Sequence, residues 1–214
     1  MELAKYIDHT ALKPETTPAD VEQLCKEALE YRFAAVCVNP VYVPLAARML
    51  KESGVLTATV VGFPLGASAS EIKAHEAAYA IEQGAGEIDM VMAIGLFKGG
   101  DRAAVGRDIA AVVKAAGNHP VKVIIETCFL GRDEIVEVCR IAANNGAAFV
   151  KTSTGFGPRG ASVEDVIAMK EAVGGRCHIK ASGGIRTREQ ALAMIAAGAT
   201  RIGTSAGVSI VKGA

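Results

Sequence analysis

Short apolar runs rich in β-branched residues alternate along this chain with longer segments of helical periodicity. The runs recur about every 28 residues and have the length and composition of strands. We place the predicted strands near residues 6–9, 33–39, 56–63, 87–92, 121–128, 149–153, 178–182 and 201–205. The pattern therefore predicts eight strands, each followed by a helix.

Capping signals mark the ends of the predicted helices. Hydroxylated N-cap residues precede a proline, or an acidic or amide residue three positions later. They are Thr17 with Pro18, Ser68 with Glu71, Ser162 with Asp165, and Thr187 with Gln190. Helices are expected to stop at glycines followed by alanine, namely Gly84, Gly146 and Gly198, because glycine readily adopts a left-handed C-cap conformation.

Strict alternation of strands and helices implies parallel strands joined by right-handed crossovers. Eight such units without a break in composition predict a closed (β/α)8 TIM barrel, with residues 1–214 as a single domain. An open doubly wound sheet is the alternative. Units of about 27 residues leave little length for loops, so we expect a site built mainly from strand ends.

Composition excludes several classes of function. The 23 basic and 23 acidic residues balance, which argues against a nucleic-acid partner. We expect no membrane partner and a cytoplasmic location, since no leader-like segment and no apolar run of membrane-spanning length is present. The five cysteines are expected to be reduced thiols. The four histidines lack metal-ligand spacing, so we expect no metal and no other cofactor.

Two lysines stand inside apolar strands at the same position of a repeated pattern. Residues 149–157 read FVKTSTGFG and residues 179–184 read IKASGG, which aligns Lys151 with Lys180. On neighbouring parallel strands the two ammonium groups would repel each other by about 3 kcal/mol at an effective dielectric constant near 20. This repulsion would lower one lysine pKa and produce an amine nucleophile able to form Schiff bases.

Three further polar residues lie on predicted strands. Asp89 is flanked by apolar residues and could serve as an acid/base group or as a structural ion-pair partner of the lysines. Asp8 ends the first predicted strand and could bind hydroxyl groups or pair with a lysine. Cys37 ends the second strand, where an apolar wall position is favoured over a reactive thiol.

Glycine-rich turns follow the last two predicted strands. The sequence GGIR begins at Gly183 and GTSAG begins at Gly203. In (β/α)8 barrels the loops after the seventh and eighth strands commonly bind phosphate through backbone N–H groups. We therefore expect a phosphate site there.

These segments together resemble the deoxyribose-phosphate aldolase family over the length of the chain. The matching motifs are IDHTALKP, AAVCVNP, EIDMVM, VKVIIET, FVKTSTGFG, IKASGGIR and GTSAG. The resemblance implies a class I aldolase that reversibly cleaves 2-deoxy-D-ribose 5-phosphate to acetaldehyde and D-glyceraldehyde 3-phosphate, in deoxyribonucleoside catabolism. It also implies small phosphosugar and aldehyde substrates and a homo-oligomer, either a dimer or a tetramer.

The resemblance assigns roles to particular residues. Lys151 would form the Schiff base, Lys180 would be the second lysine that perturbs it, and Asp89 would be the acid/base aspartate. Contacts to the substrate would come from Asp8, Thr10, Cys37, Gly155, Gly183, Gly184, Gly203 and Ser205. Some relatives carry a C-terminal tail with a tyrosine that reaches the site. The sequence ends at Ala214 without such a segment, so we do not expect a tail to protonate the enamine.

Three alternatives remain at the level of sequence. One is another Schiff-base aldolase of transaldolase type on the same barrel. A second is a catalytically silent barrel that binds phosphosugars, although binding alone would not require a lysine of lowered pKa. A third is a metal-dependent lyase.

Overall fold

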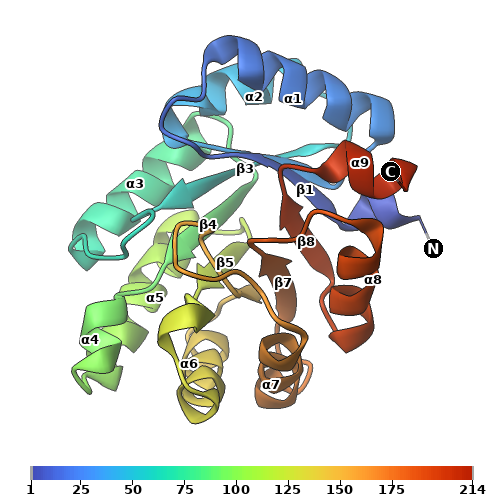
Figure 1. The fold of residues 1–214 in the computed structure, drawn as a ribbon. Coiled ribbons are helices and arrows are strands. Elements are labelled where there is room, and N and C mark those ends of the chain that lie inside the picture. The colour runs from blue at the N-terminus through green and yellow to red at the C-terminus, as the bar shows by residue number, and fades with distance from the viewer. Residues whose placement is uncertain (1, 214) are drawn as a thin grey trace.

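Eight parallel strands close into a barrel in the order of the chain in the computed structural model, which describes residues 2–213. β8 pairs with β1 and completes the barrel, while the helices surround it (Figure 1). The strands are β1 Ile7–Ala11, β2 Ala35–Val38, β3 Leu56–Val61, β4 Glu87–Val91, β5 Val121–Ile124, β6 Phe149–Lys151, β7 His178–Ser182 and β8 Arg201–Thr204. The predicted (β/α)8 barrel is confirmed.

Helices follow the strands along the chain. They are α1 Pro18–Tyr31, α2 Val43–Met49, α3 Ser70–Glu82, α4 Ile94–Lys98, α5 Arg102–Ala116, α6 Arg132–Asn144, α7 Val163–Val173, α8 Arg188–Ala197 and α9 Gly207–Lys212. The caps predicted at Thr17, Ser162 and Thr187 are confirmed, because each side chain accepts a hydrogen bond from the third residue of its helix.

The predicted cap at Ser68 is wrong. α3 begins at Ser70 with Ala69 at the N-cap position, and no side chain caps it. The Ser70 hydroxyl donates instead to Asp108 of α5 at 2.9 Å, and Lys73 donates to the same carboxylate at 2.7 Å. These tertiary contacts position the first turn, so the local signal at Ser68 does not decide where the helix starts.

Several strands are shorter than predicted. β5 ends at Ile124 because Glu126 adopts a left-handed conformation, with φ of 54°, and Thr127–Phe129 form a 3-10 helix (η3). At the start of the chain, Leu3–Tyr6 form another 3-10 helix (η1), so β1 begins one residue later than expected. A third 3-10 helix, η2, spans Pro40–Tyr42. Turns with such dihedral angles are not visible in hydrophobic periodicity.

The inside of the barrel has two different halves. Ala35 and Cys37 of β2 pack with Ala58 and Val60 of β3 in a small apolar cluster. Charged side chains fill the remainder, and they come from β4 to β8 and from β1. The larger apolar core lies between the strands and the helices. This arrangement places ionisable groups in the middle of the fold, where burial alters their chemistry.

No helix within residues 2–213 is long and apolar enough to cross a membrane. All five cysteines are free.

Candidate active site

Six charged side chains form a closed ring of alternating ion pairs inside the barrel. We call this cluster the ionic ring; its members in order are Asp89, Lys180, Asp8, Arg201, Glu87 and Lys122. The separations between charged atoms run from 2.5 to 2.9 Å. Burial of single charges is unfavourable, so such a cluster persists only because every member has a partner of opposite sign.

Lys151 lies beside this ring. Its Nζ donates to Asp89 Oδ2 at 2.7 Å, and Lys180 Nζ donates to the same oxygen at 2.8 Å. The two lysines face each other in the register of β6 and β7, as the repeated sequence pattern predicts. One carboxylate oxygen therefore bridges two amino groups, a geometry through which a proton can pass between them.

The two lysines differ in how readily they lose a proton. Burial lowers the pKa of Lys151, Asp89 raises it and Lys180 lowers it, which leaves that pKa below the usual value for lysine. Burial also lowers the pKa of Lys180, but Asp8 and Asp89 raise it well above the usual value. Lys151 is thus the amine that loses its proton more readily, and an unprotonated amine can attack a carbonyl.

Burial exceeds repulsion as the cause of the low pKa of Lys151. The sequence suggested repulsion between the two lysines, and that repulsion is present but smaller. The strand register alone cannot reveal how deeply a side chain is buried.

Asp89 is fully buried and ionised. Burial raises the pKa of Asp89, whereas Lys122, Lys151 and Lys180 lower it, and the result lies well below its usual range. Lys122 contacts Oδ1 at 2.9 Å and the other two lysines contact Oδ2. The arrangement favours Asp89 as the shared charge partner of the lysines in the resting site.

A pocket of about 380 Å³ opens above Lys151 at the carboxyl ends of the strands. Six of the residues that the sequence assigns to substrate binding line it: Thr10, Gly155, Gly183, Gly184, Gly203 and Ser205. Asp8 and Cys37 do not line it. Asp8 is fully buried in the ionic ring, and burial raises the pKa of the Cys37 thiol to about 11. Asp8 and Cys37 both lie inside the barrel, beneath the floor of the pocket.

Two of the lining glycines are required by close packing. A Cβ atom on Gly203 would lie 3.0 Å from Lys180 Cε, so the absence of a side chain there makes room for the lysine. A Cβ atom on Gly183 would lie 2.9 Å from the Cα atom of Gly160, and Gly183 has φ of 84°. These glycines shape the pocket wall at the ends of β7 and β8.

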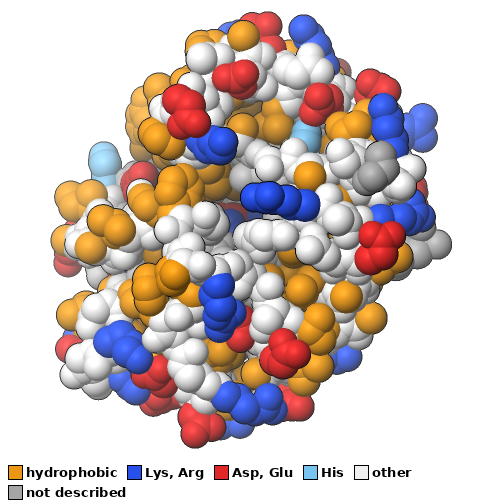
Figure 2. Space-filling view, in the orientation of Figure 1, with side chains coloured by type: hydrophobic (Ala, Val, Ile, Leu, Met, Phe, Trp, Pro, Cys, Tyr) orange, Lys and Arg blue, Asp and Glu red, His pale blue; other side chains and the backbone are white. Residues whose placement is uncertain are grey.

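Two cationic residues at the mouth of the pocket were not predicted from the sequence. Lys13 follows β1 and Arg186 follows the glycine pair after β7, and both line the pocket. Their signal was present in the motifs IDHTALKP and GGIR. Figure 2 shows basic side chains beside the hollow at the centre of this face of the molecule. They add positive charge where the backbone turns already favour an anion.

Three members of the ionic ring, Lys122, Glu87 and Arg201, were also not predicted from the sequence. Lys122 lies between Val121 and Val123, the same signal that identified Lys151, whereas Glu87 and Arg201 are the first residues of their strands. Their partners are distant in sequence, since the Arg201 contacts span 114 residues to Glu87 and 193 residues to Asp8.

Glu126 anchors the loop that follows Lys151. Its buried carboxylate accepts the backbone N–H of Thr154 at 3.2 Å and also accepts the Thr154 hydroxyl. That hydroxyl in turn accepts the N–H of Phe156 at 3.0 Å. The left-handed backbone conformation of Glu126 therefore coincides with the placement of its carboxylate against Thr154 in the pocket wall.

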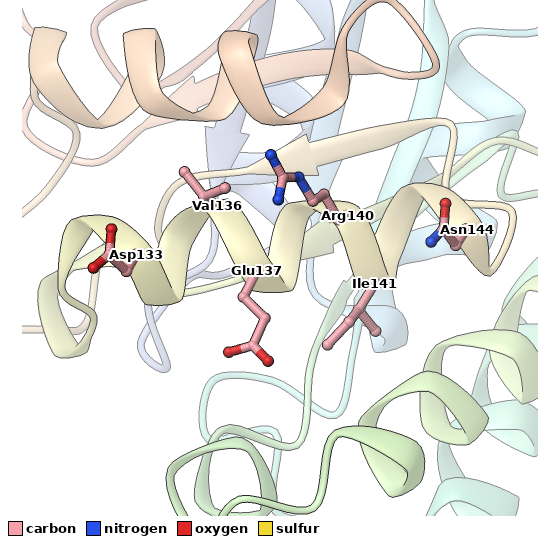
Figure 3. Close-up of a pocket in the computed structure, with 6 residues that line it drawn as sticks. All are labelled: Asp133, Val136, Glu137, Arg140, Ile141 and Asn144. Atoms are coloured by element: carbon pink, nitrogen blue, oxygen red, sulfur yellow. The ribbon is translucent and has the colours of Figure 1, made fainter.

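A second hollow of about 370 Å³ lies outside the barrel, over α6 (Figure 3). It is lined by Asp133, Val136, Glu137, Arg140, Ile141 and Asn144. Glu137 is paired with Arg102 of α5 at 2.9 Å. This hollow is remote from Lys151 and presents no convergent buried polar groups.

Comparisons with known proteins agree with the chemistry of the pocket. A family model described as DeoC/LacD family aldolase matches residues 3–213. The deoxyribose-phosphate aldolase of Thermococcus gammatolerans is 57% identical, over 100% of this chain and 97% of its own length. That of Carboxydothermus hydrogenoformans is 54% identical, over 99% of this chain and 94% of its own. The solved tetrameric deoxyribose phosphate aldolase of Aeropyrum pernix superimposes with a TM-score of 0.92 at 35% identity, over 98% of this chain and 89% of that one.

Proposed function

This chain belongs to the DeoC/LacD aldolase family, and we propose that it cleaves 2-deoxy-D-ribose 5-phosphate reversibly through a Schiff base on Lys151. The products are acetaldehyde and D-glyceraldehyde 3-phosphate. The observation that carries the assignment of the residue is the lowered pKa of Lys151, at the floor of a pocket lined by glycine turns. Both curated relatives described above are deoxyribose-phosphate aldolases, and nothing favours the transaldolase-type alternative.

The first step forms the covalent intermediate. The unprotonated amine of Lys151 attacks C1 of the open-chain sugar and gives a neutral carbinolamine. Uptake of one proton from solvent turns its hydroxyl into the leaving water and leaves a protonated iminium. Asp89 Oδ2 contacts both lysines, at 2.7 Å to Lys151 and 2.8 Å to Lys180, and so relays the protons that this step moves. Lys180 remains charged beside the intermediate.

The second step breaks a carbon–carbon bond. Acetaldehyde retains two carbons, so the bond between C2 and C3 is cleaved. The C3 hydroxyl gives its proton to solvent water and becomes the carbonyl of glyceraldehyde 3-phosphate, while the electrons of the C2–C3 bond flow into the iminium to form an enamine. Protonation of the enamine at C2 and hydrolysis of the new iminium release acetaldehyde and restore Lys151.

The phosphate group is bound at the other end of the pocket. Gly183, Gly184 and Ser205 supply a concave turn surface, and the cations of Lys13 and Arg186 lie at the same mouth. Anchoring the phosphate orients the sugar so that C1 meets Lys151. The fixed position of the reacting atoms then lowers the entropic part of the barrier.

Trapping of the intermediate tests this proposal. We expect intact-mass spectrometry after incubation with deoxyribose 5-phosphate and sodium borohydride to show one reduced adduct, which peptide mapping assigns to Lys151. Activity should survive a chelator. An active protein that gives no adduct and loses its activity to the chelator would contradict the Schiff-base mechanism and favour a metal-dependent lyase.

We also propose that the protein forms a homo-oligomer, a dimer or a tetramer. The support is the tetrameric Aeropyrum pernix structure, which matches 98% of this chain. Mass determination in solution by light scattering should give two or four times the 22.1 kDa of one chain. A monomeric mass at micromolar concentration would contradict this.

A cytoplasmic location fits the thiol chemistry. All five cysteines are free, which suits a reducing compartment. Cell fractionation that recovers the protein outside the cytoplasm would overturn this part of the proposal.

A further inference from the structure

The ionic ring is electrically balanced without Lys151. Its three carboxylates and three cations cancel, and they alternate around the ring. Lys151 lies outside the ring and contacts it at one atom, Asp89 Oδ2, which Lys180 also contacts. A protonated Lys151 therefore leaves the cluster of seven groups with one positive charge in excess, whereas a neutral Lys151 leaves it neutral.

We infer that Lys122, Glu87 and Arg201 are positioning residues that set the protonation of Lys151 by completing this charge balance. The two cations favour its neutral, nucleophilic form, and Glu87 holds them in place while opposing part of their effect. The inference rests on the proposed function of Lys151. None of the three lines the pocket, so they act through Asp89 and not on the substrate.

The contacts show how this influence reaches Lys151. Lys122 donates to Asp89 Oδ1 at 2.9 Å, so part of the aspartate's negative charge is already neutralised from the side away from Lys151. Glu87 accepts from Lys122 at 2.7 Å and from Arg201 at 2.5 Å, which holds both cations in the ring. The aspartate that Lys151 contacts is therefore shared among three lysines.

Lys13 and Arg186 line the mouth of the pocket above Lys151 and are common to all the variants below. The charged and titratable groups inside the barrel come from six strands. They are Asp8 on β1, Cys37 on β2, Glu87 and Asp89 on β4, Lys122 on β5, Lys180 on β7 and Arg201 on β8. Burial raises the pKa of Cys37 to about 11, so this thiol is uncharged at neutral pH and does not alter the count. The other six are the ring.

The balance of charges in the ring also affects cleavage of the carbon–carbon bond. The protonated iminium on Lys151 again places one excess positive charge beside a balanced ring. Electron flow into the iminium forms the neutral enamine and removes that charge. An extra carboxylate would stabilise the positive iminium relative to the neutral enamine, whereas a ring with balanced charges does not. In a buried site of low dielectric constant, the balanced ring therefore favours electron flow into the iminium and cleavage of the bond.

The test measures how fast sodium cyanoborohydride traps acetaldehyde on Lys151 as a function of pH, by intact mass. Lys122→Met removes a cation, so protonation of Lys151 restores the charge balance of the cluster. The midpoint of the trapping rate against pH should therefore rise by about one pH unit. Glu87→Gln removes an anion, and the midpoint should fall by about the same amount. The double variant restores the balance and should return close to the wild-type midpoint.

The control is Lys73→Met. Lys73 is as fully buried as Lys122 and is paired with Asp108 at 2.7 Å, but this pair lies between α3 and α5, outside the ring. Its removal should leave the midpoint unchanged. Because the reagent's own pH dependence is common to all variants, differences between midpoints report on Lys151.

Unchanged midpoints in both single variants, or shifts in the same direction, would overturn the inference and leave the ring as a packing element. Glu87→Gln nearly preserves shape, so its downward shift decides the matter alone if Lys122→Met does not fold. Wild-type protein that gives no adduct on Lys151 would instead overturn the proposed function, together with this inference. The two failures are therefore distinguishable.

Discussion

Lys151→Leu should abolish turnover while leaving the fold intact. The substitution removes the amine that forms the covalent bond, and no remaining group in the pocket replaces it. It leaves the six members of the ionic ring fully paired, because Asp89 Oδ2 keeps its contact with Lys180 at 2.8 Å. We therefore expect kcat to fall by at least about 10⁴-fold, a loss of roughly 5 kcal/mol of transition-state stabilisation.

Steady-state cleavage of deoxyribose 5-phosphate and thermal unfolding monitored by circular dichroism check this prediction together. The unfolding temperature should match or exceed that of the wild type, since replacing a buried amine outside the balanced ring by an apolar side chain leaves no charge without a partner. Turnover within tenfold of the wild type would show that another group carries the covalent step. A large loss of stability would mean that the ring depends on Lys151.

Lys180→Leu should have the opposite effect on stability. Lys180 contacts Asp8 Oδ2 at 2.5 Å and Asp89 Oδ2 at 2.8 Å, and all three side chains are fully buried. Its removal leaves two carboxylates short of a partner, and breaking a buried pair in this way costs about 3–5 kcal/mol. We therefore expect Lys180→Leu to destabilise the fold and Lys151→Leu not to, although both lysines are buried and adjacent.

The same variant should change the pH dependence. Loss of the Lys180 ammonium removes a repulsion and exposes more negative charge, so the pKa of Lys151 should rise by about one to two units. Near neutral pH this lowers the fraction of neutral amine, and the acid limb of kcat/KM moves to higher pH. A profile with an unshifted acid limb would mean that burial alone sets the pKa of Lys151.

The different roles of Lys151 and Lys180 could be predicted from the sequence only in part. The repeat FVKTSTG and IKASGG correctly predicted that Lys151 and Lys180 occupy the same register on adjacent strands. It did not predict which charges lie near each lysine. Asp8 was expected either at the pocket wall or as the partner of a lysine. The structure confirms the second alternative, because Asp8 pairs with Lys180, and also with Arg201, beneath the pocket floor.

The reason is that depth in a barrel depends on strand tilt and stagger, which a sequence pattern of period two does not encode. Asp8 and Cys37 point into the barrel, as their positions in the strands implied. Along a tilted strand, however, a shift of one or two residues moves a side chain from the pocket wall to the buried layer beneath it. Thr10 is two residues after Asp8 and does line the pocket.

Sequence by itself determined the alternation of eight strands and helices, the order of the motifs and the pairing of Lys151 with Lys180, because these depend on local periodicity and on parallel register. Only the tertiary structure decided the closure of the ionic ring and hence the charge state of its members. Contacts such as Arg201 with Asp8, 193 residues apart, exist only after the barrel has closed. Electrostatic energy depends on distance and burial in three dimensions, and neither can be read from the order of residues.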